Sequence, residues 1–281
     1  MAQKDWHEVI QLIDKTAPGF WDQYKAGGEF FSRNFSAKEL GKEKPGSWIP
    51  VYKKEHLPEW FHENKIMPIR AGQAEFFFLK GNVFFDLEDY SFSPYLADTI
   101  EPLEEFFPAT LRADFQRNEN AYLNKAMALG YINHFIASDA LHILKREIET
   151  KRRTRLLYGQ FGKIRTTVPF SFATSAGSRP INPGFQFEID LVLESPTEII
   201  VIEAKCGSKP VTSFSLLQLY YPLIYFRSVL KEQKKIRTIF IDINTHSRKE
   251  AYHMLEVEFE GERFDEVRVL KDAVYVNAVD S

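Results

Sequence analysis

The stretch FEIDLVLESPTEIIVIEAK, residues 187–205, predicts a β-hairpin whose two strands carry acidic side chains. Two strand-like runs, 187–194 and 199–205, flank a polar turn that contains proline, as longer hairpin loops often do. If the strands pair symmetrically about this turn, Asp190 lies directly opposite Glu203. Opposed side chains on one face of a sheet have Cβ atoms roughly 4.5–5.5 Å apart. The hairpin is therefore expected to hold two carboxylates side by side.

The two faces of the hairpin differ in chemistry. Side chains alternate across a strand, so Lys205 shares the face of Asp190 and Glu203. The opposite face is apolar throughout: Phe187, Ile189, Leu191, Leu193, Ile200, Ile202 and Ala204. We expect this apolar face to lie in the core. A competing interpretation of the acidic face is a solvated ion pair, because Glu188 faces Lys205 in the same register.

The paired carboxylates indicate a metal site. Two carboxylates held together repel each other and usually need a cation between them. Oxygen ligands suit Mg²⁺, which commonly binds through one or two carboxylates and a substrate phosphate. A lysine beside such an ion is placed to hold an attacking water or a phosphoryl oxygen. Asp190, Glu203 and Lys205 therefore predict a Mg²⁺ site for phosphoryl chemistry, and we expect Mn²⁺ to substitute.

This arrangement resembles the active site of the PD-(D/E)XK nucleases, the restriction-endonuclease-like superfamily. Asp190 matches the first acid of that family, and Glu203, Ala204 and Lys205 match its E-x-K half. Ile189 stands where the family usually has proline. The resemblance implies that the backbone carbonyl of Ala204 is a further metal ligand.

The order of the predicted elements extends the resemblance over residues 119–244. Helices, a strand, the hairpin, a helix and a strand are expected in this order: 119–136, 138–151, 161–172, 187–205, about 213–231 and 237–244. If the strands on either side of the last helix are parallel, their connection is right-handed. The expected fold is α/β, with a restriction-endonuclease-like αβββαβ core and a mixed central sheet. The tail, 254–277, predicts two further strands.

Residues 1–105 differ from the rest of the chain in their sequence pattern, and we expect a separate small α+β domain there. All four tryptophans lie in this part of the chain, and the stretch 74–87 predicts an aromatic hairpin that turns at 80–82. Prolines interrupt the pattern over 101–115, where we place the boundary. The nuclease-like domain is then 106–281, and the N-terminal domain is expected to help recognise DNA.

Two further residues are candidates through the resemblance. In many enzymes of this kind, an acid on the helix before the hairpin helps to hold a second metal, and Glu119 occupies such a position. An acid in the first turn of a helix also simply favours the helix dipole. In RecB-like nucleases a Gln and a Tyr follow the E-x-K strand. Gln218 matches the first, but Pro222 stands in the place of the second, and a partly buried glutamine explains Gln218 equally well.

Basic residues and a polar loop are the candidate DNA contacts. The basic candidates precede the hairpin: Lys151, Arg152, Arg153, Arg155, Lys163 and Arg165. The loop 173–184 adds Arg179 and Asn182, which could reach a groove. The alternatives without a role in DNA binding are a solvated helix face for the basic residues and an ordinary solvated loop for residues 173–184. Since the net charge is −3, any DNA surface must be confined to one cleft.

Composition and missing motifs exclude several classes of protein. A single cysteine excludes an intramolecular disulfide and fits a reducing cytosol, so we expect a cytoplasmic location. The first residues lack a signal-peptide profile, and no apolar run approaches the roughly 18 residues of a membrane span. No Walker A, G-x-G-x-x-G or G-x-S-x-G motif occurs, which removes NTPase, dehydrogenase and serine-hydrolase interpretations.

The resemblance implies a Mg²⁺-dependent, sequence-specific endonuclease for double-stranded DNA, most like a type II restriction enzyme. Such an enzyme leaves 5′-phosphate and 3′-hydroxyl ends and acts as a homodimer on a palindromic site. It also implies a companion DNA methyltransferase in the host. Two alternatives stay open: a structure-specific repair or recombination nuclease of the same fold, and a non-catalytic DNA-binding protein with a nuclease-like domain.

Overall fold

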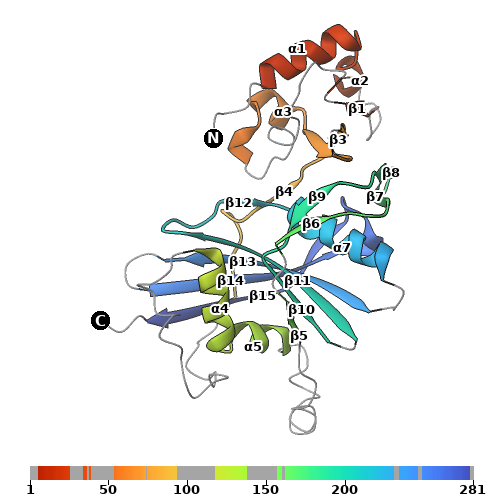
Figure 1. Ribbon diagram of the computed structural model, residues 1–281. Coiled ribbons are helices and arrows are strands. Elements are labelled where there is room, and N and C mark those ends of the chain that lie inside the picture. Colours follow the sequence, from red (N-terminus) through yellow and green to blue (C-terminus); the bar gives the residue numbers. More distant parts are fainter. Residues whose placement is uncertain are drawn as a thin grey trace.

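A mixed six-stranded sheet lies at the centre of the protein, with helices on both of its faces (Figure 1). The computed structural model describes these residues: 6–25, 34–36, 38, 54–73, 75–93, 118–137, 157–159, 162–195, 197–230, 234–245 and 249–278. The helix expected over 138–151 and the domain boundary expected over 101–115 lie outside them. The protein is of mixed α/β class, and strands dominate.

The central sheet combines parallel and antiparallel pairs. Its strands, in spatial order, are β15 (Val267–Ala278), β14 (Lys249–Phe259), β13 (Lys235–Asn244), β11 (Glu198–Gly207), β10 (Leu191–Glu194) and β5 (Leu157–Gly159). β11 and β13 are parallel, and α7 (Leu217–Val229) connects them. Every other neighbouring pair in this sheet is antiparallel. The prediction of a mixed sheet is therefore confirmed, as are the two strands expected in the tail.

The hairpin of β10 and β11 has the expected register. Leu191 lies opposite Ile202, and Leu193 lies opposite Ile200. The turn is stabilised by Ser195, whose N–H donates to the Glu198 carbonyl at 2.9 Å and whose Oγ accepts from the Glu198 N–H at 3.0 Å. Continuing this register by one residue beyond Leu191 brings Asp190 beside Glu203.

The first strand of the hairpin is shorter than the sequence predicts. It divides into β9 (Gln186–Glu188) and β10, and β9 pairs with β6 (Lys163–Arg165) instead of β11. Glu188 consequently lies opposite Lys163, so the expected pairing of Glu188 with Lys205 is wrong. The cause is packing, because Phe187 and Ile189 join the hydrophobic cluster on the α7 side and not the cluster that contains Leu191.

Both faces of the sheet are buried. α4 (Glu119–Ala128) and α5 (Tyr131–Ala137) cover one face, and α7 covers the other (Figure 1). The α4 and α5 side contains most of the apolar face expected from the sequence: Leu191, Leu193, Ile200, Ile202 and Ala204. The α7 side is apolar as well, since it contains Val192, Ile199 and Val201. Asp190 and Glu203 lie on this second face by strand alternation, at the end where β10 begins.

The helix expected over 119–136 is two helices. Asn118 caps the first, since its side chain accepts from the Ala121 N–H at 2.9 Å. The break falls at Gly130, whose φ of 77° lies in the left-handed region that glycine adopts without a Cβ clash. The turn allows α5 to lie over the sheet beside α4 (Figure 1).

Three further local predictions are wrong. The helix expected from about residue 213 begins only at Leu217, because β12 (Ser213–Ser215) pairs with β4 (Phe84–Asp86). The loop expected over 173–184 contains a hairpin of β7 (Phe170–Thr174) and β8 (Gly177–Ile181). The strand expected over 161–172 is likewise divided between β6 and β7. In each case pairing with a distant or neighbouring strand outweighs local turn chemistry.

The N-terminal part forms a small α+β layer beside the sheet. Its elements are α1 (Trp6–Thr16), α2 (Asp22–Lys25), β1 (Phe35–Ser36), a 3₁₀ turn (Lys54–His56), α3 (Glu59–Glu63), β2 (Ile66–Arg70) and β3 (Glu75–Lys80). β3 lies between β1 and β2, while β4 pairs with β12, so the expected aromatic hairpin does not form. One hydrophobic cluster extends from Trp6 to Phe264, and Phe77 contacts Phe172 across the two parts of the chain. Their division into two domains stays a prediction.

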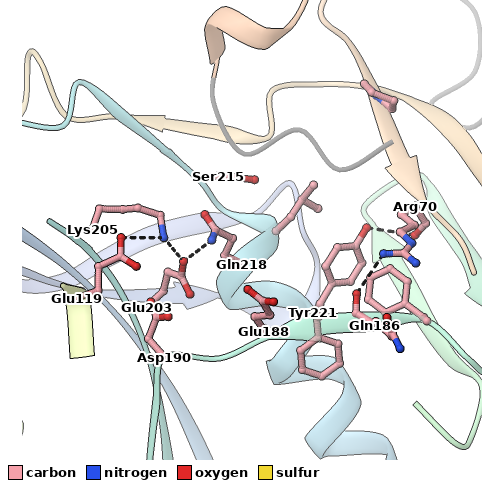
Figure 2. Close-up of a pocket in the computed structure, with 14 residues that line it drawn as sticks. Arg70, Glu119, Gln186, Glu188, Asp190, Glu203, Lys205, Ser215, Gln218 and Tyr221 are labelled. Carbon is pink, nitrogen blue, oxygen red and sulfur yellow. Dashed lines mark hydrogen bonds and ion pairs between the residues drawn. The ribbon is translucent and has the colours of Figure 1, made fainter. Parts of the chain in front are cut away.

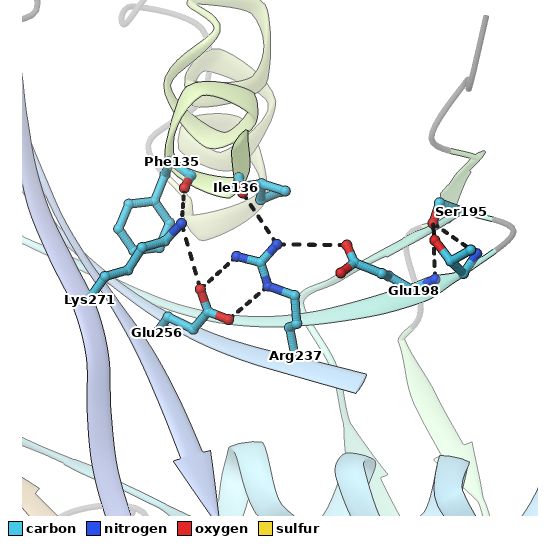
Figure 3. Close-up of polar contacts among 8 residues, drawn as sticks. Phe135, Ile136, Ser195, Glu198, Arg237, Glu256 and Lys271 are labelled. Atoms are coloured by element: carbon cyan, nitrogen blue, oxygen red, sulfur yellow. Dashed lines mark hydrogen bonds and ion pairs between the residues drawn. The ribbon is translucent and has the colours of Figure 1, made fainter. Parts of the chain in front are cut away.

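A buried ion-pair network fastens α5 to the sheet (Figure 3). The Arg237 guanidinium donates to both carboxylate oxygens of Glu256, at 2.7 and 2.6 Å, and to the carbonyl of Ile136 at 3.2 Å. Lys271 donates to the carbonyl of Phe135. Cations at the C-terminus of a helix satisfy its last carbonyls and interact favourably with its dipole. The network thereby holds the layer that also includes α4.

Candidate active site

A cavity of about 260 Å³ opens at the start of β10, between the sheet, α7 and β2 (Figure 2). One side of it is polar: Glu119, Glu188, Asp190, Glu203, Lys205, Ser215 and Gln218. The other side consists of Pro68, Arg70, Phe185, Gln186, Phe187, Leu217 and Tyr221. The cavity thus combines an acidic end, which holds the predicted triad, with a largely aromatic end that carries an arginine.

Asp190 and Glu203 meet at the acidic end, as the hairpin register requires. Asp190 accepts a hydrogen bond from the Ala204 N–H at 2.8 Å, which fixes its carboxylate against β11. Glu203 is only 3% exposed, and it accepts from both Lys205 Nζ and Gln218 Nε2. Burial raises the pKa of Glu203 to about 8; the positive charge of Lys205 opposes this rise, and the nearby charge of Asp190 adds to it.

Lys205 bridges several oxygens of the site. Its Nζ donates to Glu203 and to the backbone carbonyl of Ala204, at 3.0 Å in the second case, and it lies 3.9 Å from a carboxylate oxygen of Glu119. Burial alone would lower the pKa of Lys205, but the charges of Glu203 and Glu119 outweigh it and raise the pKa above its ordinary value. Lys205 is therefore a cation at neutral pH.

Glu119 reaches the site from the first turn of α4. Burial raises the pKa of Glu119, which the Lys205 charge partly offsets. The structure thus places all five predicted residues of the acidic end together: Glu119, Asp190, Glu203, Lys205 and Gln218. The carbonyl of Ala204, expected as a ligand from the resemblance, points to Lys205 Nζ.

Two polar atoms in the cavity wall lack a partner. The Oε1 atom of Gln218 and the Oγ atom of Ser215 are buried, and neither makes a hydrogen bond within the described part of the chain. Sequence analysis identified Gln218 through the resemblance and missed Ser215. In sequence, Ser215 resembles an ordinary residue at a helix start, and only the pairing of β12 with β4 buries it.

Arg70 and Tyr221 were also missed. Arg70 is the last residue of β2, and its Nη1 donates to the Gln186 carbonyl at 3.3 Å while its guanidinium lies over the Phe185 ring, 5.1 Å from the centroid. The Tyr221 hydroxyl donates to the Arg70 carbonyl at 3.2 Å (Figure 2). No sequence motif connects Arg70 to the hairpin, because more than a hundred residues separate them.

The predicted DNA contacts that the structure describes do not line the cavity. Four of them, Lys151, Arg152, Arg153 and Arg155, lie outside the described residues. Lys163 forms an exposed ion pair with Glu188 at 3.1 Å, and Arg165 is exposed.

The remaining two predicted contacts lie on or beside the β7–β8 hairpin. Arg179 is in β8, opposite Phe172. The Asn182 side chain donates to Glu75 at 2.5 Å, and its N–H donates to the Ala71 carbonyl at 2.7 Å, so Asn182 joins the hairpin to the N-terminal layer. A role of these residues in DNA binding stays a prediction.

The donor atoms at the acidic end fit Mg²⁺. Asp190, Glu203 and the Ala204 carbonyl offer only oxygen atoms as ligands. The two carboxylates are adjacent and the pKa of Glu203 is raised, so a divalent cation between them would reduce their mutual repulsion. Among the described residues, no group of three or more His, Cys, Asp and Glu side chains is arranged to hold a metal ion. The Lys205 ammonium contacts Glu203 and the Ala204 carbonyl, so it supplies the positive charge at this position.

Comparison with known proteins identifies the family. Neither the curated proteins nor the solved structures include a match. Among the helices that the structure describes, none combines the length and apolar character needed to cross a membrane. A family model described as a domain of unknown function, DUF6997, matches residues 80–276, from the end of β3 nearly to the end of β15. The match includes the whole acidic end of the cavity and covers well over half of the 281 residues, so the chain belongs to the DUF6997 family.

Proposed function

We propose that this protein is a Mg²⁺-dependent endonuclease that hydrolyses phosphodiester bonds of double-stranded DNA. The observation that carries the proposal is the meeting of Asp190, Glu203 and Lys205 at one end of a cavity, in the register expected of a D…E-x-K hairpin. Buried acids beside a lysine in a cavity, with a strongly raised pKa at Glu203, are typical of functional sites.

The arrangement of the elements supports the same proposal. Along the chain, α4 and α5 are followed by β5, β10, β11, α7 and β13, and the four strands are neighbours in the order β5-β10-β11-β13. Among the strands that the structure describes, only β11 and β13 pair in parallel, and α7 joins them. This order agrees with an αβββαβ core, in which the hairpin carries the acids and the following helix packs beside them. Gln218 on that helix contacts Glu203.

Each residue of the acidic end then has a distinct role. Asp190, Glu203 and the Ala204 carbonyl would hold Mg²⁺, which would supply Lewis-acid activation of the phosphate and of the attacking water. Lys205 stabilises the negative charge that develops on the phosphoryl group, or orients the attacking water. Gln218 donates to Glu203 and so fixes the orientation of its carboxylate. The buried Glu203 carboxyl must be ionised before it can serve as a ligand, which makes the reaction favour alkaline pH.

The substrate and assembly follow from the same resemblance. We propose sequence-specific cleavage of the type II restriction kind, which leaves 5′-phosphate and 3′-hydroxyl ends. A homodimer would cut both strands of a palindromic site, because two-fold protein symmetry matches two-fold DNA symmetry. Such an enzyme works beside a DNA methyltransferase that protects the host.

Cleavage of plasmid and linear duplex DNA by the purified full chain, in Mg²⁺ and in Mn²⁺, tests the proposal. Asp190→Ala and Glu203→Ala should each abolish cleavage. Glu188→Ala is the matched control, because Glu188 also lines the cavity but pairs with exposed Lys163, and it should cleave normally. Full cleavage by the Asp190 variant would contradict the assignment. A wild-type chain that binds DNA but leaves it intact in both metals would favour the non-catalytic alternative.

A further inference from the structure

The N-terminus of α7 lies in the wall of the cavity and has no side-chain cap. α7 is 13 residues long, and Leu216 in its N-cap position makes no capping hydrogen bond. The first two helical residues, Leu217 and Gln218, both line the cavity. The first N–H groups of a helix lack intrahelical partners, and the helix dipole makes this end positive. Helix ends of this kind bind anions, phosphate groups in particular.

Ser215, two residues before the helix, supplies a second and independent indication. It is 0% exposed, it lines the cavity, and its Oγ has no hydrogen-bond partner in the described part of the chain. A buried hydroxyl without a partner costs free energy, and such groups are rare in native proteins. A molecule that enters the cavity is placed to provide the missing partner. Figure 2 shows Ser215 and Gln218 together in the cavity wall.

The surrounding structure holds Ser215 firmly. β12 pairs with β4, where Ser215 lies opposite Phe84, and the next N–H, that of Leu216, donates to the Val83 carbonyl at 2.8 Å. On its other side, Phe214 stacks on Phe240 of the central sheet with ring centroids 3.7 Å apart. The backbone of Ser215 therefore cannot turn away from the cavity without breaking these contacts, and the hydroxyl is positioned before any ligand arrives.

We propose that Ser215 Oγ and the first N–H groups of α7 form a phosphate subsite beside the acidic cluster. The cations of the cavity, Lys205 and Arg70, lie on either side of it in Figure 2. The carboxylates of Asp190 and Glu203 repel an anion and restrict it to the α7 wall. This inference rests on the proposed function in one respect: the phosphate is taken to belong to the nucleic-acid strand that is cut. Ser215 is a binding residue in this scheme and takes no part in metal ligation.

The first experiment measures phosphate binding without any metal ion. Inorganic phosphate is titrated into the full chain, into Ser215→Ala and into Ser213→Ala, with calorimetry and thermal shift as readouts. Ser213 is the matched control, since it belongs to the same strand but does not line the cavity. Ser215→Ala should weaken phosphate binding about tenfold, the effect of losing one hydrogen bond to a charged group. Ser213→Ala should bind like the wild type. Equal affinity in all three proteins overturns the subsite.

The second experiment connects the subsite to nucleic acid. Steady-state cleavage of duplex DNA should show a KM about tenfold higher for Ser215→Ala, with a smaller change in kcat, because the contact is present before the transition state. If the wild type does not cleave DNA but loses phosphate binding with Ser215→Ala, the proposed function fails and the subsite stands. If cleavage depends on Asp190 but neither phosphate affinity nor KM responds to Ser215→Ala, the function stands and the subsite is wrong.

Discussion

Glu203 and Glu256 are two buried carboxylates on the central sheet, and their surroundings are opposite in character. Both are almost fully buried, at 3% and 2% exposed, and both contact cations. Glu256 receives the two parallel hydrogen bonds of Arg237, which also reaches a helix carbonyl (Figure 3). Glu203 shares one oxygen between Lys205 and Gln218, and the cavity beside it contains two polar atoms without partners.

This difference distinguishes a structural ion pair from a site that can bind a ligand. A bidentate guanidinium matches a carboxylate in geometry and charge, so the Glu256 network is complete as it stands. At Glu203 a second acid, Asp190, lies nearby, and burial raises the Glu203 pKa to about 8. Such an arrangement is costly to the fold and becomes favourable only when a cation or a proton joins it. The predictions below test this contrast.

Breaking the structural pair should have the largest effect on stability. Arg237→Met removes the partner of Glu256 and leaves a buried charge, at a cost of about 3–5 kcal/mol in the free energy of unfolding. Chemical denaturation measures this cost. The double variant Arg237→Met/Glu256→Leu removes both charges and should recover most of the loss. A single variant as stable as the wild type would show that the network contributes little, and the contrast with Glu203 would disappear.

Removing the cation of the open site should affect rate and leave the fold intact. Lys205→Ala should lower the single-turnover rate of DNA cleavage about 10²–10³-fold, since charge stabilisation of this kind contributes about 2.7–4 kcal/mol to the transition state. DNA affinity should change far less. Lys271→Ala, which alters a cation of the structural network, is the control and should leave the rate unchanged. A defect confined to DNA affinity would make Lys205 only a phosphate anchor.

The sequence predicts the acidic end of the site much better than the rest of the cavity. Asp190 and Glu203 are brought together by a hairpin whose register depends on local alternation and one turn, and both are visible in the sequence. Arg70 and Ser215 depend on contacts between segments far apart in the chain: β2 against α7 and β4 against β12. No local pattern contains those contacts. The sequence therefore predicts the acidic end and misses the wall that shapes the rest of the cavity, including Arg70.

The errors in the fold have the same origin. The apolar alternation predicts a continuous strand that places Glu188 beside Lys205, but Phe187 and Ile189 pack on the α7 side and end the pairing with β11. The single helix expected over 119–136 breaks at Gly130, because glycine adopts the left-handed conformation of this turn without a Cβ clash. Features that depend on short-range chemistry, such as the Asn118 cap, form as the sequence favours.

The pH dependence of stability should distinguish the two carboxylates without any assay of activity. The folded-state pKa of Glu203 is raised from about 4.5 to about 8. A raised carboxyl pKa contributes stability that is complete below the unfolded value and is lost as pH rises through the folded value. At about 1.4 kcal/mol per pKa unit, the wild type should lose roughly 3 kcal/mol between pH 4.5 and pH 7, in the absence of metal, relative to Glu203→Gln.

Denaturation midpoints across this pH range provide the measurement for Glu203→Gln. Glu188→Gln serves as the control, because it removes a cavity carboxyl that is exposed and pairs with Lys163 instead of the acidic cluster. Added Mg²⁺ should raise the stability of the wild type at pH 8 and have little effect on Glu203→Gln, since the variant lacks one carboxylate of the proposed site. Parallel pH profiles for the wild type and Glu203→Gln would show that the ionised Glu203 carboxylate does not destabilise the fold.

The smallest expected effect concerns the helix that carries Glu119 to the site. α4 begins at the acidic end, where Asn118 caps it, whereas α5 ends on Arg237 and Lys271. Asn118→Ala should lower the free energy of unfolding by about 1 kcal/mol, the ordinary cost of losing a helix cap, as measured by chemical denaturation. Because the first turn of α4 positions Glu119 near Lys205, the variant should also cleave DNA a few-fold more slowly at the same pH. Asn118→Asp restores an oxygen acceptor and should recover stability. A variant that loses stability but keeps the full cleavage rate would show that Glu119 is not held in place by the cap.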